Sequence, residues 1–299
     1  YRKWLITYLT SQNIKLADFA GFCYGVNRAV ETAKKLKAEN PNIDVCVLGE
    51  LIHNTDVINE LNKLGIKTIY EIPEKGNGIC IIRSHGATPE TYEKIKNAGF
   101  SVIDMTCPDV QKVQKKAIEL AKQDYFVIIV GKSNHPEVMA IKANADLYTE
   151  KVAVATEVNE LKPYEAMIKS HKRVGVVVQT TQMLSTLNDI VTYLNSIAKE
   201  ILIHNTICKS TALRQSEAKD LAKESDLMIV VGSKKSANTT HLAEILKDYT
   251  KTIHIENDSE LKNYSDEISK AKNIGITAGA STPQSIIDKV IAKIKSKEY

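Results

Sequence analysis

Residues 107–137 read CPDVQKVQKKAIELAKQDYFVIIVGKSNHPE. After Cys107, apolar residues recur at helical spacing between Val110 and Ala121, with lysines on the opposite face. The run FVIIV at 126–130 is continuously apolar, as parallel strands covered on both faces are. A glycine and a polar loop ending at Glu137 follow it. The stretch therefore predicts one helix–strand unit with a cysteine at its start and a polar loop at its end.

The same order of features occurs once before and once after this stretch. The other two copies run from Cys23 to Gly49 and from Cys208 to Gly232, and the three cysteine-to-glycine offsets are 26, 24 and 24 residues. Four residues beyond each glycine stand His53, His135 and Ser236. A repeated period indicates a repeat architecture.

We therefore expect an α/β fold of three αβ units, related by pseudo-threefold symmetry as a trefoil around a central cluster site. Strands that alternate with helices predict parallel sheets. The expected organisation is an irregular extension over residues 1–12, followed by αβ units at 13–106, 107–207 and 208–299.

Composition limits the class of protein. The chain has 299 residues, of which 43% are apolar and 25% charged, and its net charge is +4. The lysines are scattered and no apolar run reaches the ~18–20 residues of a membrane span, so we expect neither nucleic acid nor membrane as a partner. The five cysteines are odd in number and show no C-x-x-C pair, which argues against a zinc ribbon or a disulfide framework. A cytoplasmic location is expected.

Three cysteines, one in each unit, are placed at the starts of predicted helices: Cys23, Cys107 and Cys208. Helix N-termini lower the pKa of thiols, and the thiolate is the form that binds iron–sulfur clusters. Three sulfurs that met near an axis would hold a [4Fe–4S] cluster with one iron not bound by protein. By analogy with catalytic metal sites, substrate would bind at that open position. Cys46 and Cys80 lie within apolar strands and are expected in the core.

Polar loops recur at the predicted carboxyl ends of strands, where ligands gather in α/β sheets. Their hydroxyl, amide and imidazole groups at helix N-termini suit a phosphate or diphosphate. Glu137, two residues from His135 across a proline, is the candidate proton donor. The candidate ligand-binding residues are His53, His85, His135, Thr180, Ser236, Asn238 and Ser281.

A series of motifs spans about residues 13–294 in order: GFCYGV at 21–26, IHN at 52–54, SHG at 84–86, TCP at 106–108, HPEV at 135–138, QTT at 179–181, IC at 207–208, GSKKSAN at 232–238 and TAGAS at 277–281. Together they resemble the 4-hydroxy-3-methylbut-2-enyl diphosphate reductase (IspH/LytB) family. HPEV alone would be a weak signal, whereas the full series is specific.

The resemblance implies an oxidoreductase that removes the hydroxyl of its allylic diphosphate substrate and forms isopentenyl and dimethylallyl diphosphate, the last step of the non-mevalonate isoprenoid pathway. It implies that Cys23, Cys107 and Cys208 hold an oxygen-sensitive [4Fe–4S] cluster. Catalytic roles are implied for Glu137, His135 and Thr180. Binding of the substrate is implied for His53, His85, His135, Thr180, Ser236, Ala237, Asn238 and Ser281.

One departure from the family pattern is Ala237, where some members carry a second serine, although the backbone N–H at this position can still bind the diphosphate. The chain has no G-x-G-x-x-G nucleotide-binding motif. Electrons are therefore expected from a protein donor such as ferredoxin or flavodoxin.

Two alternatives remain open at this point. One is a three-cysteine cluster enzyme like quinolinate synthase, which condenses small acids; the His-Pro-Glu and Ser-x-Asn loops argue against it. The other is a non-catalytic iron–sulfur sensor, which would leave Glu137 without a task.

Overall fold

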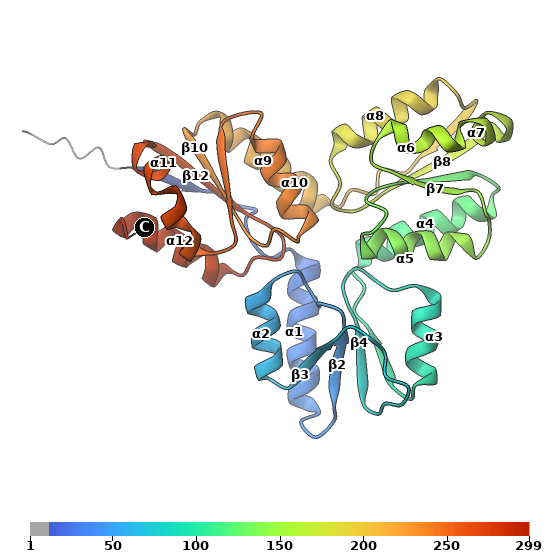
Figure 1. The fold of residues 1–299 in the computed structure, drawn as a ribbon, viewed down its shortest axis with the longest axis horizontal. Helices are drawn as coiled ribbons and strands as arrows, with labels where there is room; N and C mark the ends of the chain where they lie inside the picture. The colour runs from blue at the N-terminus through green and yellow to red at the C-terminus, as the bar shows by residue number, and fades with distance from the viewer. Residues whose placement is uncertain (1–11, 299) are drawn as a thin grey trace, which may run out of the picture. The chain divides into compact units, whose positions relative to one another are not determined.

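Strands and helices alternate along residues 12–298, the part of the chain that our computed structural model describes. They form three four-stranded sheets, in the orders β3-β2-β4-β5, β7-β6-β8-β9 and β1-β12-β10-β11, and the paired strands are parallel (Figure 1). This confirms the predicted α/β class with three parallel-sheet units. The chain divides into two compact units, residues 23–212 and residues 12–22 with 213–298. Except for residue 12, the predicted extension lies outside the described residues.

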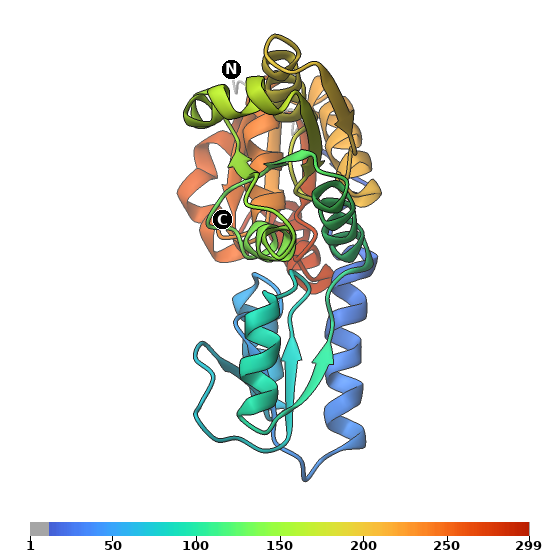
Figure 2. The ribbon, with the colours of Figure 1, turned by 90° about the vertical axis from the view of Figure 1, so that its right-hand side faces the viewer.

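The first sheet of the unit 23–212 is covered by helices on both faces, and Figure 2 shows its strands between α1 and α3. Strand β4 is buried along its whole length, as its uninterrupted apolar sequence predicts. Cys46 and Cys80 are neighbours on paired strands within the apolar core, where they were expected. The elements are β2 (Val45–Leu48), β3 (Ile66–Ile69), β4 (Ile79–Ile82) and β5 (Ser101–Asp104), with α1 (Tyr24–Glu39), α2 (Thr55–Lys63) and α3 (Pro89–Asn97).

The second sheet of this unit shows why FVIIV is apolar throughout. Phe126, Ile128 and Val130 of β6 pack into one core cluster, and Val127 and Ile129 pack into another on the opposite face. Helices α4 and α5 cover one face, and α6, α7 and α8 cover the other (Figure 1). The elements are β6 (Phe126–Val130), β7 (Val152–Ala155), β8 (Arg173–Val178), β9 (Glu200–Ile203), α4 (Pro108–Lys122), α5 (Pro136–Asp146), α6 (Val158–Leu161), α7 (Glu165–His171) and α8 (Leu184–Asn195).

The third sheet corrects one predicted boundary. The predicted αβ unit 13–106 includes strand β1, but this strand pairs in parallel with β12, so that Asn13 lies opposite Asn273. It therefore occupies the outer position that β5 holds beside β4 and β9 holds beside β8. The elements are β1 (Asn13–Leu16), β10 (Leu227–Val231), β11 (Lys251–Ile255), β12 (Asn273–Ala278), α9 (Lys209–Lys223), α10 (Ala237–Leu246), α11 (Ser265–Lys270) and α12 (Gln284–Ser296).

The three outer strands β1, β5 and β9 each lead the chain toward one of the predicted cluster cysteines. The polar loops follow the inner strands of each sheet, at their carboxyl ends. Among residues 12–298, none of the helices is both long and apolar enough to cross a membrane.

Candidate functional site

Each of the three predicted cluster cysteines immediately precedes a helix. Cys23 is the N-cap of α1, and its Sγ accepts a hydrogen bond from the Val26 N–H at 3.5 Å. Cys208 Sγ likewise accepts the Thr211 N–H at 3.4 Å, in the first turn of α9. Cys107 is the N-cap of α4, which begins with proline. The helix starts expected from the sequence are therefore present at all three cysteines.

Two of the cysteines form backbone hydrogen bonds with neighbouring polar loops. The Cys107 N–H donates to the Ser84 carbonyl at 3.0 Å, beside His85. The Cys208 N–H donates to the Thr180 carbonyl at 3.0 Å. In two of the sheets, these bonds join the segment that follows the outer strand to the loop that follows the neighbouring inner strand. The positions of these two sulfurs are thus linked to those of the candidate ligand-binding side chains.

The three cysteines lie in one region of the unit 23–212. A Cβ added to Gly25 would stand 2.7 Å from Cys107 Sγ and 3.9 Å from Cys23 Sγ, so a side chain at this position would collide with the sulfur of Cys107. Cys208 lies close enough to Cys23 for a charge on Cys23 to raise the pKa of the Cys208 thiol. Two thiols beside a glycine, with a third thiol near Cys23, fit an iron–sulfur cluster, which needs thiolate ligands and close approach of the backbone.

Helix N-termini are expected to lower the pKa of these thiols, but the pKa values of Cys107 and Cys208 are raised. Burial raises the pKa of both Cys107 and Cys208, and hydrogen bonds from the first helical turns lower it by less. The predicted effect of the helix N-terminus is therefore present, but desolvation outweighs it. A coordinated metal ion deprotonates such thiols outright.

Tyr24 and Asp109 are polar neighbours of the cysteines to which the sequence reasoning gave no role. The Tyr24 hydroxyl donates to Asp109 at 2.9 Å and accepts a weak, 3.9 Å hydrogen bond from Cys107 Sγ. The charge of Asp109 also raises the pKa of Cys208 and of Glu137. Asp109 thus stands near both the cysteine region and the candidate proton donor. Its position two residues after Cys107, in the first turn of α4, was the available signal.

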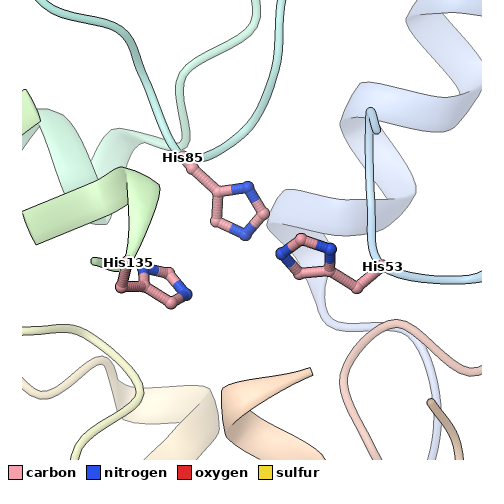
Figure 3. A group of neighbouring side chains, drawn as sticks. All are labelled: His53, His85 and His135. Atoms are coloured by element: carbon pink, nitrogen blue, oxygen red, sulfur yellow. The ribbon is translucent and has the colours of Figure 1, made fainter. Parts of the chain in front are cut away.

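His53, His85 and His135 come together in the same unit, as Figure 3 shows. The rings of His53 and His85 are stacked with centroids 4.9 Å apart, and the ring of His135 stands edge-on, 5.3 Å from His85. One nitrogen from each ring lies within 4.8 Å of the others. The three histidines follow β2, β4 and β6, so strands of two sheets supply them.

His85 is held neutral. Burial lowers its pKa well below 6.5, and electrostatic interactions with His53, His135 and Arg83 lower it further. Its Nδ1 is buried and has no hydrogen-bond partner within residues 12–298. A buried polar atom without a partner is uncommon and marks a place where a ligand or water belongs.

Glu137 is the most strongly buried acidic group of the site, with 1% of its surface exposed. Thr180 donates to both carboxyl oxygens, from its N–H to Oε1 at 2.7 Å and from Oγ1 to Oε2 at 2.8 Å. Burial raises the pKa of Glu137 to about 7, although the Thr180 hydrogen bonds oppose the shift. A carboxyl group that still carries a proton near neutral pH is suited to be a general acid.

Ser236, Ala237, Asn238 and Ser281 belong to the other unit. Ser236 is the N-cap of α10, and the next two residues are buried in its first turn. Ser281 is buried in the loop after β12. A Cβ added to Gly279 would stand 1.8 Å from Thr239 Oγ1, so this loop lies directly against the start of α10. The structure therefore brings these four residues to neighbouring segments of one unit.

Two charged residues beside the histidines were not assigned a role from the sequence. Glu50 Oε2 lies 2.9 Å from His53 Nδ1. The Arg83 guanidinium lies against Gly49 and within electrostatic range of Glu50. Each residue stands at the start of a predicted polar loop, directly after Gly49 or β4, and this position was the signal that could have found them.

Comparison with known proteins gives consistent matches. A family model described as "LytB protein" matches residues 14–295. A protein of Geobacter sulfurreducens named 4-hydroxy-3-methylbut-2-enyl diphosphate reductase is 40% identical over 283 residues, which is 94% of this chain and 96% of that protein. The Clostridium tetani protein of the same name is 43% identical over 95% of this chain. The chain spans 44% of the length of that relative.

The solved structures that resemble this chain include two diphosphate reductases. One is that of (E)-4-hydroxy-3-methyl-but-2-enyl diphosphate reductase, described as the terminal enzyme of the non-mevalonate pathway; it is 38% identical with a TM-score of 0.69, and the match covers 95% of this chain and 99% of that one. The other is the E-1-hydroxy-2-methyl-but-2-enyl-4-diphosphate reductase from Plasmodium falciparum. It is 26% identical with a TM-score of 0.85, over 94% of this chain and 87% of that one.

Proposed function

The chain belongs to the LytB family, and we propose that it is a reductase that converts (E)-4-hydroxy-3-methylbut-2-enyl diphosphate to isopentenyl and dimethylallyl diphosphate. The observation that carries this proposal is Glu137, a buried carboxyl group with a pKa of about 7, held by Thr180 in the unit that also gathers the three cysteines and the three histidines. Neither a quinolinate-synthase-like reaction nor a passive sensor accounts for this set of groups.

The diphosphate is bound by the three histidines. Their rings surround a common space into which one nitrogen of each ring points (Figure 3). In the other unit, backbone and side-chain donors of Ser236, Ala237, Asn238 and Ser281 are also suited to bind a diphosphate, since they stand at a helix N-terminus and a strand end. An anchored diphosphate fixes the position of the hydroxyl-bearing carbon and lowers the entropic cost of reaching the transition state.

Glu137 supplies the proton that allows the hydroxyl oxygen to leave as water. The overall change consumes two electrons and two protons: the C–O bond breaks, water leaves, and a C–H bond forms. Thr180 holds the carboxyl group through two hydrogen bonds and so fixes its orientation toward the substrate hydroxyl. His135 accepts the Glu137 N–H through Nδ1 at 3.2 Å, and its Nε2 therefore carries the proton in the neutral ring.

Cys23, Cys107 and Cys208 would hold a [4Fe–4S] cluster that leaves one iron without a protein ligand. When bound, such a cluster supplies electrons one at a time and a Lewis-acidic iron for the substrate oxygen. A ferredoxin or flavodoxin is the proposed electron donor, since the chain carries no G-x-G-x-x-G motif for a nicotinamide cofactor.

The test is turnover by the anaerobically reconstituted protein with dithionite and a viologen as reductant. We expect the allylic diphosphate to be consumed and isopentenyl and dimethylallyl diphosphate to appear in mass spectra. Mössbauer spectroscopy of the same sample should show one iron that differs from the other three. A fully loaded cluster without consumption of this substrate would refute the proposed function.

A further inference from the structure

Arg28 of α1 contacts the segment of chain that leads to Cys107. Its Nη2 donates to the Thr106 carbonyl at 2.8 Å and to the Met105 carbonyl at 3.4 Å. Thr106 directly precedes Cys107 in the sequence. Helix α1 itself begins at Cys23, so one helix carries the first predicted cluster ligand and binds the backbone next to the second.

The same face of α1 also lies against the sulfur of Cys107. A Cβ added to Gly25 would stand 2.7 Å from Cys107 Sγ, and residues three apart on a helix share a face, so Gly25 and Arg28 both face Cys107. The Thr106 N–H donates to Asp104 Oδ1 at 2.8 Å, within the strand-end segment itself. The backbone that ends at Cys107 is therefore fixed from α1 as well as from the end of its own strand.

Arg214 of α9 forms an equivalent contact with the segment that leads to Cys23. The side chain is buried, with 2% of the residue exposed; its Nε donates to the Phe19 carbonyl at 2.9 Å and its Nη2 to the Gly21 carbonyl at 2.7 Å. Glu217, one turn further along α9, accepts the Phe19 N–H at 2.9 Å. Phe19 is thus bound through both its N–H and its carbonyl, and Gly21 is bound two residues before Cys23.

The two arginines stand at matching places after two of the three cysteines. Arg28 is five residues after Cys23, and Arg214 is six residues after Cys208. In each case the helix that follows one cysteine binds the backbone just before another. Helix α4, which follows the third cysteine, carries no arginine, so the arrangement occurs twice. Its recurrence in the repeat indicates that these contacts belong to the cysteine site.

We propose that Arg28 and Arg214 are positioning residues for the cluster: each holds the backbone that places a cysteine sulfur, so that the ligands are arranged before iron is inserted. The inference rests on the proposed function, because it assumes that Cys23, Cys107 and Cys208 hold a cluster. Arginine suits this role, since its guanidinium is always charged and presents several N–H groups in a fixed geometry, so one side chain binds two carbonyls. A lysine keeps the charge and loses this geometry.

The experiment measures how tightly the anaerobically reconstituted protein holds its iron, by titration with an iron chelator. Arg28→Met loses both hydrogen bonds and keeps a side chain of similar shape near the helix. The chelator concentration that removes half of the iron should therefore fall roughly three- to tenfold, the range expected for a lost hydrogen bond. Arg28→Lys should recover part of this loss, because its ammonium group can still donate to one carbonyl. Lys35→Met is the matched control: Lys35 lies on the same helix in an exposed ion pair with Glu39, and the variant should hold iron like the wild type.

Thermal unfolding of the iron-free proteins separates a positioning role from a general loss of stability. Arg28 is an exposed residue, so iron-free Arg28→Met should unfold at about the wild-type temperature. Arg214 is buried and is tested by Arg214→Lys, which keeps the charge and should also hold iron less tightly.

Three outcomes decide the matter. If Arg28→Met and Arg214→Lys both hold iron as tightly as the wild type, the inference is overturned. It is also overturned if the iron-free Arg28→Met protein is destabilised as much as its iron binding is weakened. A wild-type protein that forms no cluster would overturn the cysteine assignment and this inference with it, whereas a fully loaded wild type without turnover would overturn the reductase function alone.

Discussion

Replacing Glu137 by glutamine tests the proposed proton donor most directly. Glutamine has nearly the same shape, and its amide can keep both Thr180 contacts: the carbonyl oxygen accepts the Thr180 N–H, and the amide N–H donates to Thr180 Oγ1. The substitution therefore removes the acidic proton and leaves the packing of a side chain that is 1% exposed almost unchanged.

The size of the effect follows from the pKa. With a pKa of about 7, roughly half of the Glu137 carboxyl groups are protonated at pH 7, whereas a carboxyl group at the ordinary value of 4.5 would be protonated in about one molecule in 300. Loss of a general acid costs about 10²–10⁴-fold in rate. We expect Glu137→Gln to lower turnover by about that factor and to bind isopentenyl diphosphate as tightly as the wild type. Wild-type turnover should fall as pH rises above about 7, because Glu137 then loses its proton.

The same pKa shift predicts a pH-dependent change in stability. Because the folded-state pKa is raised, the folded protein binds one proton more than the unfolded chain between pH 4.5 and about 7, so this group makes the protein less stable as pH rises through that window. The full difference is about 3 kcal/mol. Glu137→Gln lacks this titrating group. Its free energy of unfolding, relative to that of the wild type, should therefore rise by up to about 3 kcal/mol between pH 4.5 and pH 8.

The assays are turnover with dithionite and a viologen, calorimetric binding of isopentenyl diphosphate, and urea unfolding at the two pH values. A Glu137→Gln variant whose turnover stays within about threefold of the wild type would refute Glu137 as the acid, since general acids contribute far more than this. If the difference in unfolding free energy between Glu137→Gln and the wild type is the same at pH 4.5 and at pH 8, the raised pKa is refuted.

Three further predictions concern the cysteine region and the hydrogen bonds that Thr180 donates to Glu137. Cys107→Ser should lose the visible absorption of the iron–sulfur cluster, and retained colour with full iron content would contradict its assignment as a ligand. Gly25→Ala places a methyl group 2.7 Å from Cys107 Sγ, so iron per chain should drop after reconstitution; a variant that loads fully would show that the backbone can give way. Thr180→Val removes a hydrogen bond that lowers the pKa of Glu137, so the fall of turnover at high pH should move to higher pH, and a shift in the opposite direction would exclude this role.

Local sequence patterns were sufficient to predict the principal strands and the helices that follow the cysteines. They were also sufficient to predict that a parallel sheet with its helices occurs three times. Continuous apolar runs such as FVIIV identify buried parallel strands because both faces of such a strand are covered. The edge strands β3, β7 and β11 were missed, because short strands of mixed composition carry little periodic signal. Candidate site residues could be selected because their motifs recur at matching places.

The partnerships of those residues arise from contacts between segments distant in sequence. Strand β1 joins β12 across about 260 residues, and no local pattern specifies which sheet a first strand will extend. Thr180 donates hydrogen bonds to Glu137, from which it is separated by 43 residues in the sequence. The pKa values of Glu137 and His85 depend on desolvation, which arises only when several segments pack around a group. Residue type and order therefore specify which chemical groups are available, and their protonation follows from the packing that removes water from them.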